Sequence, residues 1–135
     1  MTHLNEATHR ILDAPHIAVL ATTNPDGQPQ TSVIFVTAEG DDILFSTIKG
    51  RRKTTNMVRD PRVNLLLHSS ELNTYATISG TVQLTEDPDA SFHQVMYDIH
   101  MGGATPPPEP GAERVIVRLT PTKIYNQPEY VAAAE

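Results

Sequence analysis

The sequence predicts a mainly β fold, in which six antiparallel strands close into a barrel and a few short helices are added. Short segments rich in alternating or β-branched residues recur along the chain. Turn signals made of Asn, Asp, Pro and Gly separate most of these segments. A parallel sheet would need a crossover helix between successive strands, and the helical segments are too few to supply them. These observations favour the antiparallel arrangement.

The first half of the chain begins with a short amphipathic helix over residues 4–13, and Pro15 lies just beyond its end. The sequence Asn-Pro-Asp-Gly at 24–27 is a hairpin signal, because Pro presets the first turn dihedral and Gly accepts a positive one. A second turn is expected at 39–42. The strands joined by these turns are expected at 16–22, 30–37 and 43–47. We expect these three strands to form a meander.

The second half combines helices and strands. A basic stretch at 49–59 has a helical period and ends at Asp60-Pro61. The strand expected at 75–84 alternates cleanly, which predicts that one of its faces belongs to the core. The residues of that face are Ala76, Ile78, Gly80, Val82 and Leu84. The remaining elements are expected to be a strand at 63–68, a helix at 87–100, a proline-rich loop at 102–111 and a strand at 114–125.

Length and composition bound the class of protein. A chain of 135 residues is the size of one domain, so we expect a single domain over residues 1–135. The chain has no run of about 20 apolar residues, and its N-terminus lacks the pattern of a secretory signal. We therefore expect a cytoplasmic protein that does not act in a membrane. Cysteine is absent, which excludes disulfides, zinc–cysteine sites and thiolate nucleophiles.

The charge is distributed very unevenly along the chain. The formal net charge is −6, yet residues 49–62 hold six of the ten Lys and Arg residues and only one acid. This cationic segment needs an anionic partner, and a small polyanion suits its size. A nucleic acid is a poor candidate, because the segment has no aromatic residue to stack on a base and the acidic remainder would repel a long polyanion.

A helical wheel gathers four bases and one amide of this segment within about a third of a turn. They are Lys49, Arg52, Lys53, Asn56 and Arg59. The N-terminal end of the expected helix would add its positive dipole to the same anion site. The alternative is a solvated helix whose bases pair with surface acids. Pairs within the helix do not explain the bases, because Asp60 is the only acid within three or four positions of them.

The order of three segments resembles the flavin/deazaflavin-dependent oxidoreductases related to pyridoxamine 5′-phosphate oxidase, over nearly the whole chain. The segments are LATTNPDGQPQTSVIFV, LFSTIKGRRKTTNMVRDPRVNLLL and YATISGTVQL. The sequence is most similar to the branch that uses the deazaflavin coenzyme F-420. In that branch a short strand ends in Ser or Thr, here Ser46 and Thr47, and an Arg-x-Lys-x-x-Asn run follows, here residues 51–56.

The resemblance implies a split β-barrel of the FMN-binding type and a homodimer with cofactor sites at the subunit interface. It implies contacts to the cofactor phosphate at Arg51 and Lys53, and positions lining the ring on several strands. For the ring-lining positions, the alternative is ordinary exposed residues of strand edges and ends. Combined with the helical wheel, the predicted cofactor-binding residues are Gln30, Ser32, Ser46, Thr47, Lys49, Arg51, Arg52, Lys53, Asn56, His68, Tyr75 and Thr77.

The resemblance implies an oxidoreductase that transfers a hydride between coenzyme F-420 and a small unsaturated organic substrate. No catalytic acid or base can be named from the sequence, which is expected where the cofactor supplies the chemistry. No metal site is predicted, since His93 and His100 have no third ligand near them.

Two alternatives for the function stay open. One is an FMN-binding oxidase or flavin reductase of the same fold. FMN offers one phosphate, whereas the deazaflavin tail offers a phosphodiester and several carboxylates, which suits six bases better. An oxidase that takes pyridoxamine phosphate itself is less favoured, because basic residues are scarce after Arg118. The other alternative is a non-catalytic carrier or sensor of a flavin or a haem-related molecule.

Overall fold

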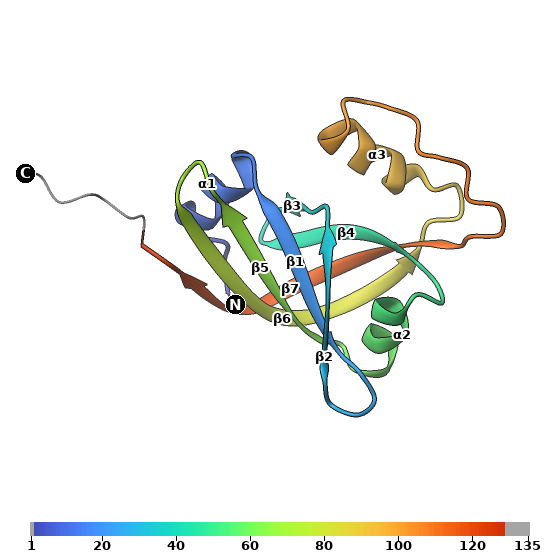
Figure 1. Cartoon of the computed structure of the whole chain (residues 1–135), viewed down its shortest axis with the longest axis horizontal. Helices are drawn as coiled ribbons and strands as arrows, with labels where there is room; N and C mark the ends of the chain where they lie inside the picture. Colours follow the sequence, from blue (N-terminus) through green and yellow to red (C-terminus); the bar gives the residue numbers. More distant parts are fainter. Residues whose placement is uncertain (1, 129–135) are drawn as a thin grey trace, which may run out of the picture.

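The protein, described here by a computed structural model over residues 2–128, is built on one strongly twisted antiparallel sheet (Figure 1). Its seven strands are β1 (Ile17–Thr23), β2 (Pro29–Ile34), β3 (Thr37–Glu39), β4 (Asp42–Ile48), β5 (Arg62–Ser69), β6 (Thr74–Glu86) and β7 (Arg114–Asn126). Their order across the sheet is β2-β1-β5-β6-β7-β4-β3. Three short helices accompany the sheet: α1 (Glu6–Asp13), α2 (Arg52–Arg59) and α3 (Ser91–His100).

The predicted mainly β, antiparallel class is confirmed, and each predicted strand contains or overlaps an observed one. The number of strands differs from the six expected, because the strand predicted at 30–37 ends at Ile34 and β3 follows it as a separate strand. In the described part of the chain the two edge strands, β2 and β3, do not pair with each other, so the sheet is not closed into a barrel.

The expected meander is wrong. β2 pairs with β1 alone, whereas β4 pairs with β7 and with β3. Between Ile34 and Thr37 the chain crosses from one edge of the sheet to the other, where the long strand β7 offers β4 a partner. Turn signals report pairs of strands that are neighbours in the sequence, so they could not reveal a pairing between residues about seventy positions apart.

The helices begin later than expected, and each start has a local cause. Asn5 caps α1, and its side-chain oxygen accepts a hydrogen bond from the Thr8 N–H at 2.9 Å. α2 begins at Arg52, because Gly50 has a φ of +91° and cannot belong to a helix. α3 begins at Ser91, and the buried Asp87 carboxylate accepts hydrogen bonds from the Phe92 and His93 N–H groups. These three helices contain 8, 8 and 10 residues.

One core fills the concave side of the sheet. Its fully buried side chains come from five strands and include Leu20, Phe45, Leu65, Ile78 and Val117. The inward face predicted for the strand at 75–84 is confirmed, since Ala76, Ile78 and Val82 are buried and Leu84 packs against the core. α1 and α2 add Ile11 and Met57, each 1 % exposed, to the same core.

α3 stands apart from the rest of the molecule (Figure 1). Met96 is its only buried side chain, and among the strands its main contact is β4. The loop from Gly102 to Glu113 runs back past α3 to β7, as the proline-rich sequence predicts. Among residues 2–128, no helix is both long enough and apolar enough to cross a membrane.

Candidate functional site

A small pocket lies where α2, α3 and the ends of β2 and β4 meet, and three cationic side chains line it. We call it the cationic pocket. Its volume is about 190 Å³, and its walls are Val33, Ile34, Phe35, Ser46, Arg51, Lys53, His93, Met96, Tyr97 and Arg114. It therefore brings together three of the predicted cofactor-binding residues, Ser46, Arg51 and Lys53, with residues from the distant α3 and β7.

Lys53 is one of two partly buried cations in this pocket, and Arg114 is the other. Its Nζ lies 3.4 Å from the hydroxyl of Ser32, so the pocket also reaches a fourth predicted residue. The pKa of Lys53 is lowered, first by burial and then by the nearby charges of Arg51 and Arg114. Within residues 2–128, neither Lys53 nor Arg51 has a carboxylate at ion-pair distance. A bound anion would supply a compensating charge for Lys53.

Arg114 is a functional candidate that the sequence reasoning missed. The Nη1 nitrogen of its guanidinium donates to the Ser46 hydroxyl at 3.3 Å, and Nε and Nη2 donate to the two oxygens of the Glu109 carboxylate at 3.0 and 2.8 Å. The side chain is 12 % exposed. Arg114 lies far from the basic segment in the sequence and reaches the pocket only because β7 pairs with β4, with Arg114 opposite Ile48.

Lys49 and Arg59 do not face the cationic pocket. The Nζ of Lys49 lies 2.5 Å from the Glu86 carboxylate and 3.5 Å from that of Glu113. The hydrogen bond to Glu86 raises the pKa of Lys49. Arg59 donates to the backbone carbonyl of Thr23. For Lys49 the structure favours the alternative of pairing with surface acids, which lie far from it in the sequence, whereas Arg59 bonds a backbone carbonyl and no acid.

Two further bases of the segment are exposed. Arg52 lies on the open side of α2 and does not line the cationic pocket. Arg62 forms a two-bond pair with Asp60, which lowers the pKa of Asp60 to about 2. The residues that the helical wheel placed on one face therefore do not share one surface. The helix begins at Arg52, so Lys49 lies in the turn before it.

Asn56 and Thr47 are buried and bonded within the chain. The Asn56 amide donates to the Thr22 hydroxyl at 3.1 Å and to the Asn24 side chain at 2.9 Å, which fastens α2 to the β1–β2 hairpin. Thr22 in turn donates to the side chain of Gln30 at 3.1 Å. Thr47 lies 3.0 Å from the Thr54 hydroxyl at the start of α2. These contacts assign the three predicted residues Asn56, Gln30 and Thr47 a part in positioning the pocket.

The remaining predicted residues lie elsewhere on the sheet. His68 and Tyr75 are paired across β5 and β6, and Thr77 is paired with Leu66. None of the three lines the cationic pocket. They lie on the outer face of the sheet, which also carries exposed apolar side chains at Ile17 of β1 and Tyr125 of β7. Within one chain, the ring-lining positions predicted at His68, Tyr75 and Thr77 are therefore separate from the cationic pocket, whereas the one predicted at Ser32 lies beside Lys53.

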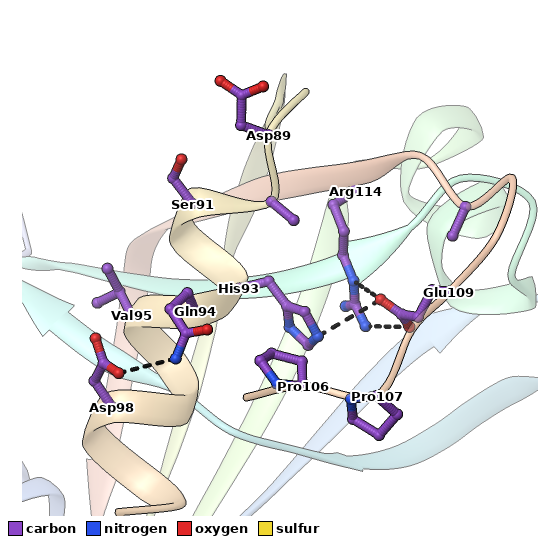
Figure 2. A pocket seen from close by; sticks show the side chains of 12 residues that line it. Asp89, Ser91, His93, Gln94, Val95, Asp98, Pro106, Pro107, Glu109 and Arg114 are labelled. Atoms are coloured by element: carbon purple, nitrogen blue, oxygen red, sulfur yellow. Dashed lines mark hydrogen bonds and ion pairs between the residues drawn. The ribbon is translucent and has the colours of Figure 1, made fainter. Parts of the chain in front are cut away.

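His93 is a second residue that the sequence did not single out for this site. It lines the cationic pocket, and its ring packs edge-on against Tyr97 at 5.1 Å. Figure 2 shows its ring turned toward Glu109, and Nε2 lies 3.6 Å from a Glu109 oxygen. Burial, followed by the charge of Arg114, lowers the pKa of His93. His100, on the same helix, instead bonds the Val36 carbonyl. Within residues 2–128, no three His, Asp or Glu side chains gather as a metal site requires.

The family of this chain follows from its similarity to known proteins. A sequence profile described as pyridoxamine 5′-phosphate oxidase matches residues 4–128. The chain belongs to this family. Pyridoxamine 5′-phosphate oxidase-like proteins are oxidoreductases that bind FMN or related flavins, so the resemblance predicted from the sequence is confirmed at the level of the family.

Curated members of the oxidase family are similar to part of this chain. The pyridoxine/pyridoxamine 5′-phosphate oxidase of Rubrobacter xylanophilus is 36% identical over 92 residues, which cover 64% of this chain and 42% of that protein. The enzyme of the same name from Cupriavidus metallidurans is 30% identical over 90 residues, or 66% of this chain and 42% of that protein. The match therefore spans less than half the length of these relatives.

Solved structures of the oxidase family share the fold. An F-420 reductase superposes with a TM-score of 0.82 at 28% identity and covers 90% of this chain and 98% of its own. A pyridoxamine 5′-phosphate oxidase-related, FMN binding protein from Nostoc punctiforme superposes with a TM-score of 0.64 at 16% identity, over 89% and 78% of the two chains. At that identity, the second likeness shows the fold alone.

The cationic pocket fits the anionic part of such a cofactor. Guanidinium groups, an ammonium and the Ser32 and Ser46 hydroxyls are the donors that phosphate oxygens accept. Ligand pockets usually measure about 300–1,000 Å³, so a space of about 190 Å³ suits a phosphate group and not a three-ring system.

Proposed function

We propose that this protein is a coenzyme F-420-dependent reductase that transfers a hydride between the deazaflavin and a small unsaturated organic substrate. The observation that carries the proposal is the convergence of Arg51, Lys53 and Arg114 on one pocket. Glu109 pairs with Arg114 and also feels the charge of Arg51, whereas within the described residues Lys53 has no carboxylate at ion-pair distance. The likeness to an F-420 reductase over nearly the whole of both chains supports the choice of cofactor.

The chain itself would bind and orient the cofactor. Lys53 and Arg51 would hold the phosphodiester, with Ser32 and Ser46 as hydrogen-bond donors and Arg114 fixed at the far wall by Glu109. Arg52, exposed at the start of α2, would attract the carboxylates of the tail. The bound deazaflavin supplies the hydride chemistry, so these residues need to position it and do not need to react.

We further propose that the active unit is a homodimer of split barrels formed by the single domain over residues 1–135. Large apolar side chains are exposed on the outer face of the sheet, among them Val33 of the edge strand β2, which is 71% exposed, and Ile17 of β1, which is 55% exposed. A second copy would cover this surface and would supply His68, Tyr75 and Thr77 to line the ring. Sedimentation of wild-type protein and Val33→Asp would test the dimer, since a strictly monomeric wild type that binds cofactor tightly would contradict it.

An FMN-dependent enzyme of the same fold is the second candidate. The names of the curated relatives and the FMN binding neighbour favour it. Against it stands the number of cations, because FMN has one phosphate and would leave part of the cationic pocket and Arg52 without an anion.

The experiment that tests the proposal is a pair of binding titrations with F-420 and FMN, each at about 50 and 300 mM salt. F-420 is expected to bind more tightly, to gain affinity with each tail carboxylate and to lose affinity more steeply with salt, because several exposed charges are screened together at a Debye length of about 10 Å. A preparation that carries stoichiometric FMN and does not bind F-420 would overturn the choice of cofactor. Binding of neither would leave a carrier of another molecule.

A further inference from the structure

One acid, Glu109, lies directly behind the cationic pocket without lining it. It belongs to the loop that returns from α3 to β7, and its two carboxylate oxygens accept hydrogen bonds from Nε and Nη2 of Arg114 (Figure 2). The third nitrogen of the same guanidinium, Nη1, donates to the Ser46 hydroxyl, which lines the pocket. Arg114 therefore has Glu109 on one edge and the cationic pocket on another.

Glu109 carries a negative charge at neutral pH. The hydrogen bond from Arg114 lowers its pKa, burial acts in the opposite direction, and the surrounding positive charges, those of Arg114 and Arg51 included, lower it further. The carboxylate therefore interacts with Arg51, a residue of the pocket wall, as well as with Arg114. Its side chain is 28 % exposed, so water and salt screen this charge only in part.

The position of Glu109 is fixed by its neighbours in the loop. Pro108 precedes it and Pro110 follows it, and a following proline restricts a residue to extended backbone conformations. The Ala112 N–H donates to the Glu109 carbonyl at 3.0 Å. Together with the two hydrogen bonds from Arg114, these constraints hold the carboxylate in place. An anion in the cationic pocket and Glu109 therefore repel each other across Arg114.

This repulsion depends on the charge of the phosphate that the pocket receives, because the Coulomb energy is proportional to the charge of the ligand. A phosphomonoester such as FMN carries nearly two negative charges at a pH of about 7.5, since its second pKa is about 6. The phosphodiester of F-420 carries one. The repulsion by Glu109 therefore costs a phosphomonoester about twice the free energy that it costs a phosphodiester.

We propose that Glu109 sets the charge preference of the cationic pocket, by weakening the binding of doubly charged phosphomonoesters more than that of singly charged phosphodiesters. Glu109 is then a specificity-determining residue that acts through Arg114 and favours F-420 over FMN. Lys53 and Arg51 bind the phosphate in either case, so these cations supply affinity and Glu109 supplies discrimination between the two phosphates. The statement about F-420 rests on the proposed function, whereas the statement about phosphate charge concerns the pocket alone.

Two small probes of the same shape separate charge from fit. Phenyl phosphate is mainly a dianion at a pH of about 7.5, and phenyl sulfate is a monoanion. Histidine labelled with carbon-13 in the imidazole ring reports their binding through the signal of His93, which lines the pocket and which His93→Gln assigns. Glu109→Gln removes the charge and keeps the shape. Glu113→Gln is the matched control, since it makes the same change in the same loop at a side chain that is 71 % exposed and pairs with Lys49.

Glu109→Gln is expected to strengthen the binding of phenyl phosphate about tenfold and that of phenyl sulfate about threefold, since two charges square the effect of one. Glu113→Gln should bind both probes like wild type, because salt screens an exposed charge. Lys53→Met should weaken both, which places the probes in the cationic pocket. An equal change for the two probes in Glu109→Gln would show a purely structural role of this residue and would overturn the proposal. No change in Glu109→Gln, or probe binding independent of Lys53, would overturn it as well.

The same variants, titrated with F-420 and FMN, separate this inference from the proposed function. Glu109→Gln should lower the Kd for FMN about threefold more than the Kd for F-420. An unchanged ratio of the two Kd values would refute the role of Glu109 in the choice of cofactor and leave the reductase function intact. If neither cofactor binds while the probes behave as expected, the proposed function is refuted, and Glu109 still sets the charge preference of the pocket.

Discussion

Replacing Lys53 by Met tests the cationic pocket most directly, because Met keeps the apolar stem and removes the charge. A charge-assisted hydrogen bond contributes about 1.5–3 kcal/mol. The lower end applies here, since the loss of Lys53 also relieves its repulsion with Arg51 and Arg114 in the free protein. We therefore expect a loss of about 1.5 kcal/mol in cofactor affinity, which is about tenfold in Kd. Without cofactor, the variant should be at least as stable as wild type, because burial disfavours the ammonium.

The assay is a fluorescence titration with F-420, with thermal unfolding of the free protein measured beside it. Lys49→Met is the matched comparison, because it removes the same charge from the same segment while Lys49 points to Glu86 and Glu113. Lys123→Met, on an exposed position of β7, controls for net charge alone. Equal loss of affinity in all three variants would show that binding depends on the net charge of the protein. An unchanged Kd in Lys53→Met would refute the statement that the cationic pocket binds the cofactor.

Three further predictions concern the framework of the site. Asn56→Ala should lower the free energy of unfolding by about 1–3 kcal/mol, because it leaves buried polar groups of the hairpin without partners, and chemical denaturation measures this. Gly80→Ala should cost about 1–3 kcal/mol or prevent folding, since a Cβ would lie 2.4 Å from the Thr120 carbonyl oxygen, and chemical denaturation measures this as well. The lowered pKa of His93 means that the unfolded chain binds its proton more readily, so stability should fall as pH drops from about 6.5 toward the folded pKa. His93→Gln should flatten that part of the pH profile, and an unchanged slope would contradict the assignment.

The local part of the fold was predictable from the sequence, and the long-range part was not. Alternation in the 75–84 segment gave the correct buried face, because the period of a strand is a property of neighbouring residues. The hairpin at 24–27 was also correct, since its turn is specified by Pro25 and Gly27. The β4–β7 pairing was missed because it depends on the packing of the whole sheet, and no turn residue encodes it.

The same limit explains the errors of the helical wheel. The wheel assumed a helix from Lys49, and Gly50 with its positive φ moves the start to Arg52. Arg51 is thereby carried to the mouth of the cationic pocket, while Lys49 turns toward Glu86. The family motif placed its contacts at Arg51 and Lys53, which both line the pocket, whereas of the bases chosen by the wheel only Lys53 does.

The framework around the cationic pocket accounts for how like charges can be held together without an anion. Asn56 anchors α2 to the β1–β2 hairpin, Thr54 bonds the Ile48 carbonyl at 2.7 Å, and Met57 is fixed in the core. These contacts prevent Lys53 from moving away from Arg114, so the repulsion is opposed by the stability of the whole fold. A ligand anion then finds its donors already in place and loses little free energy to ordering them. It follows that changes which relieve the repulsion should stabilise the free protein and weaken anion binding together.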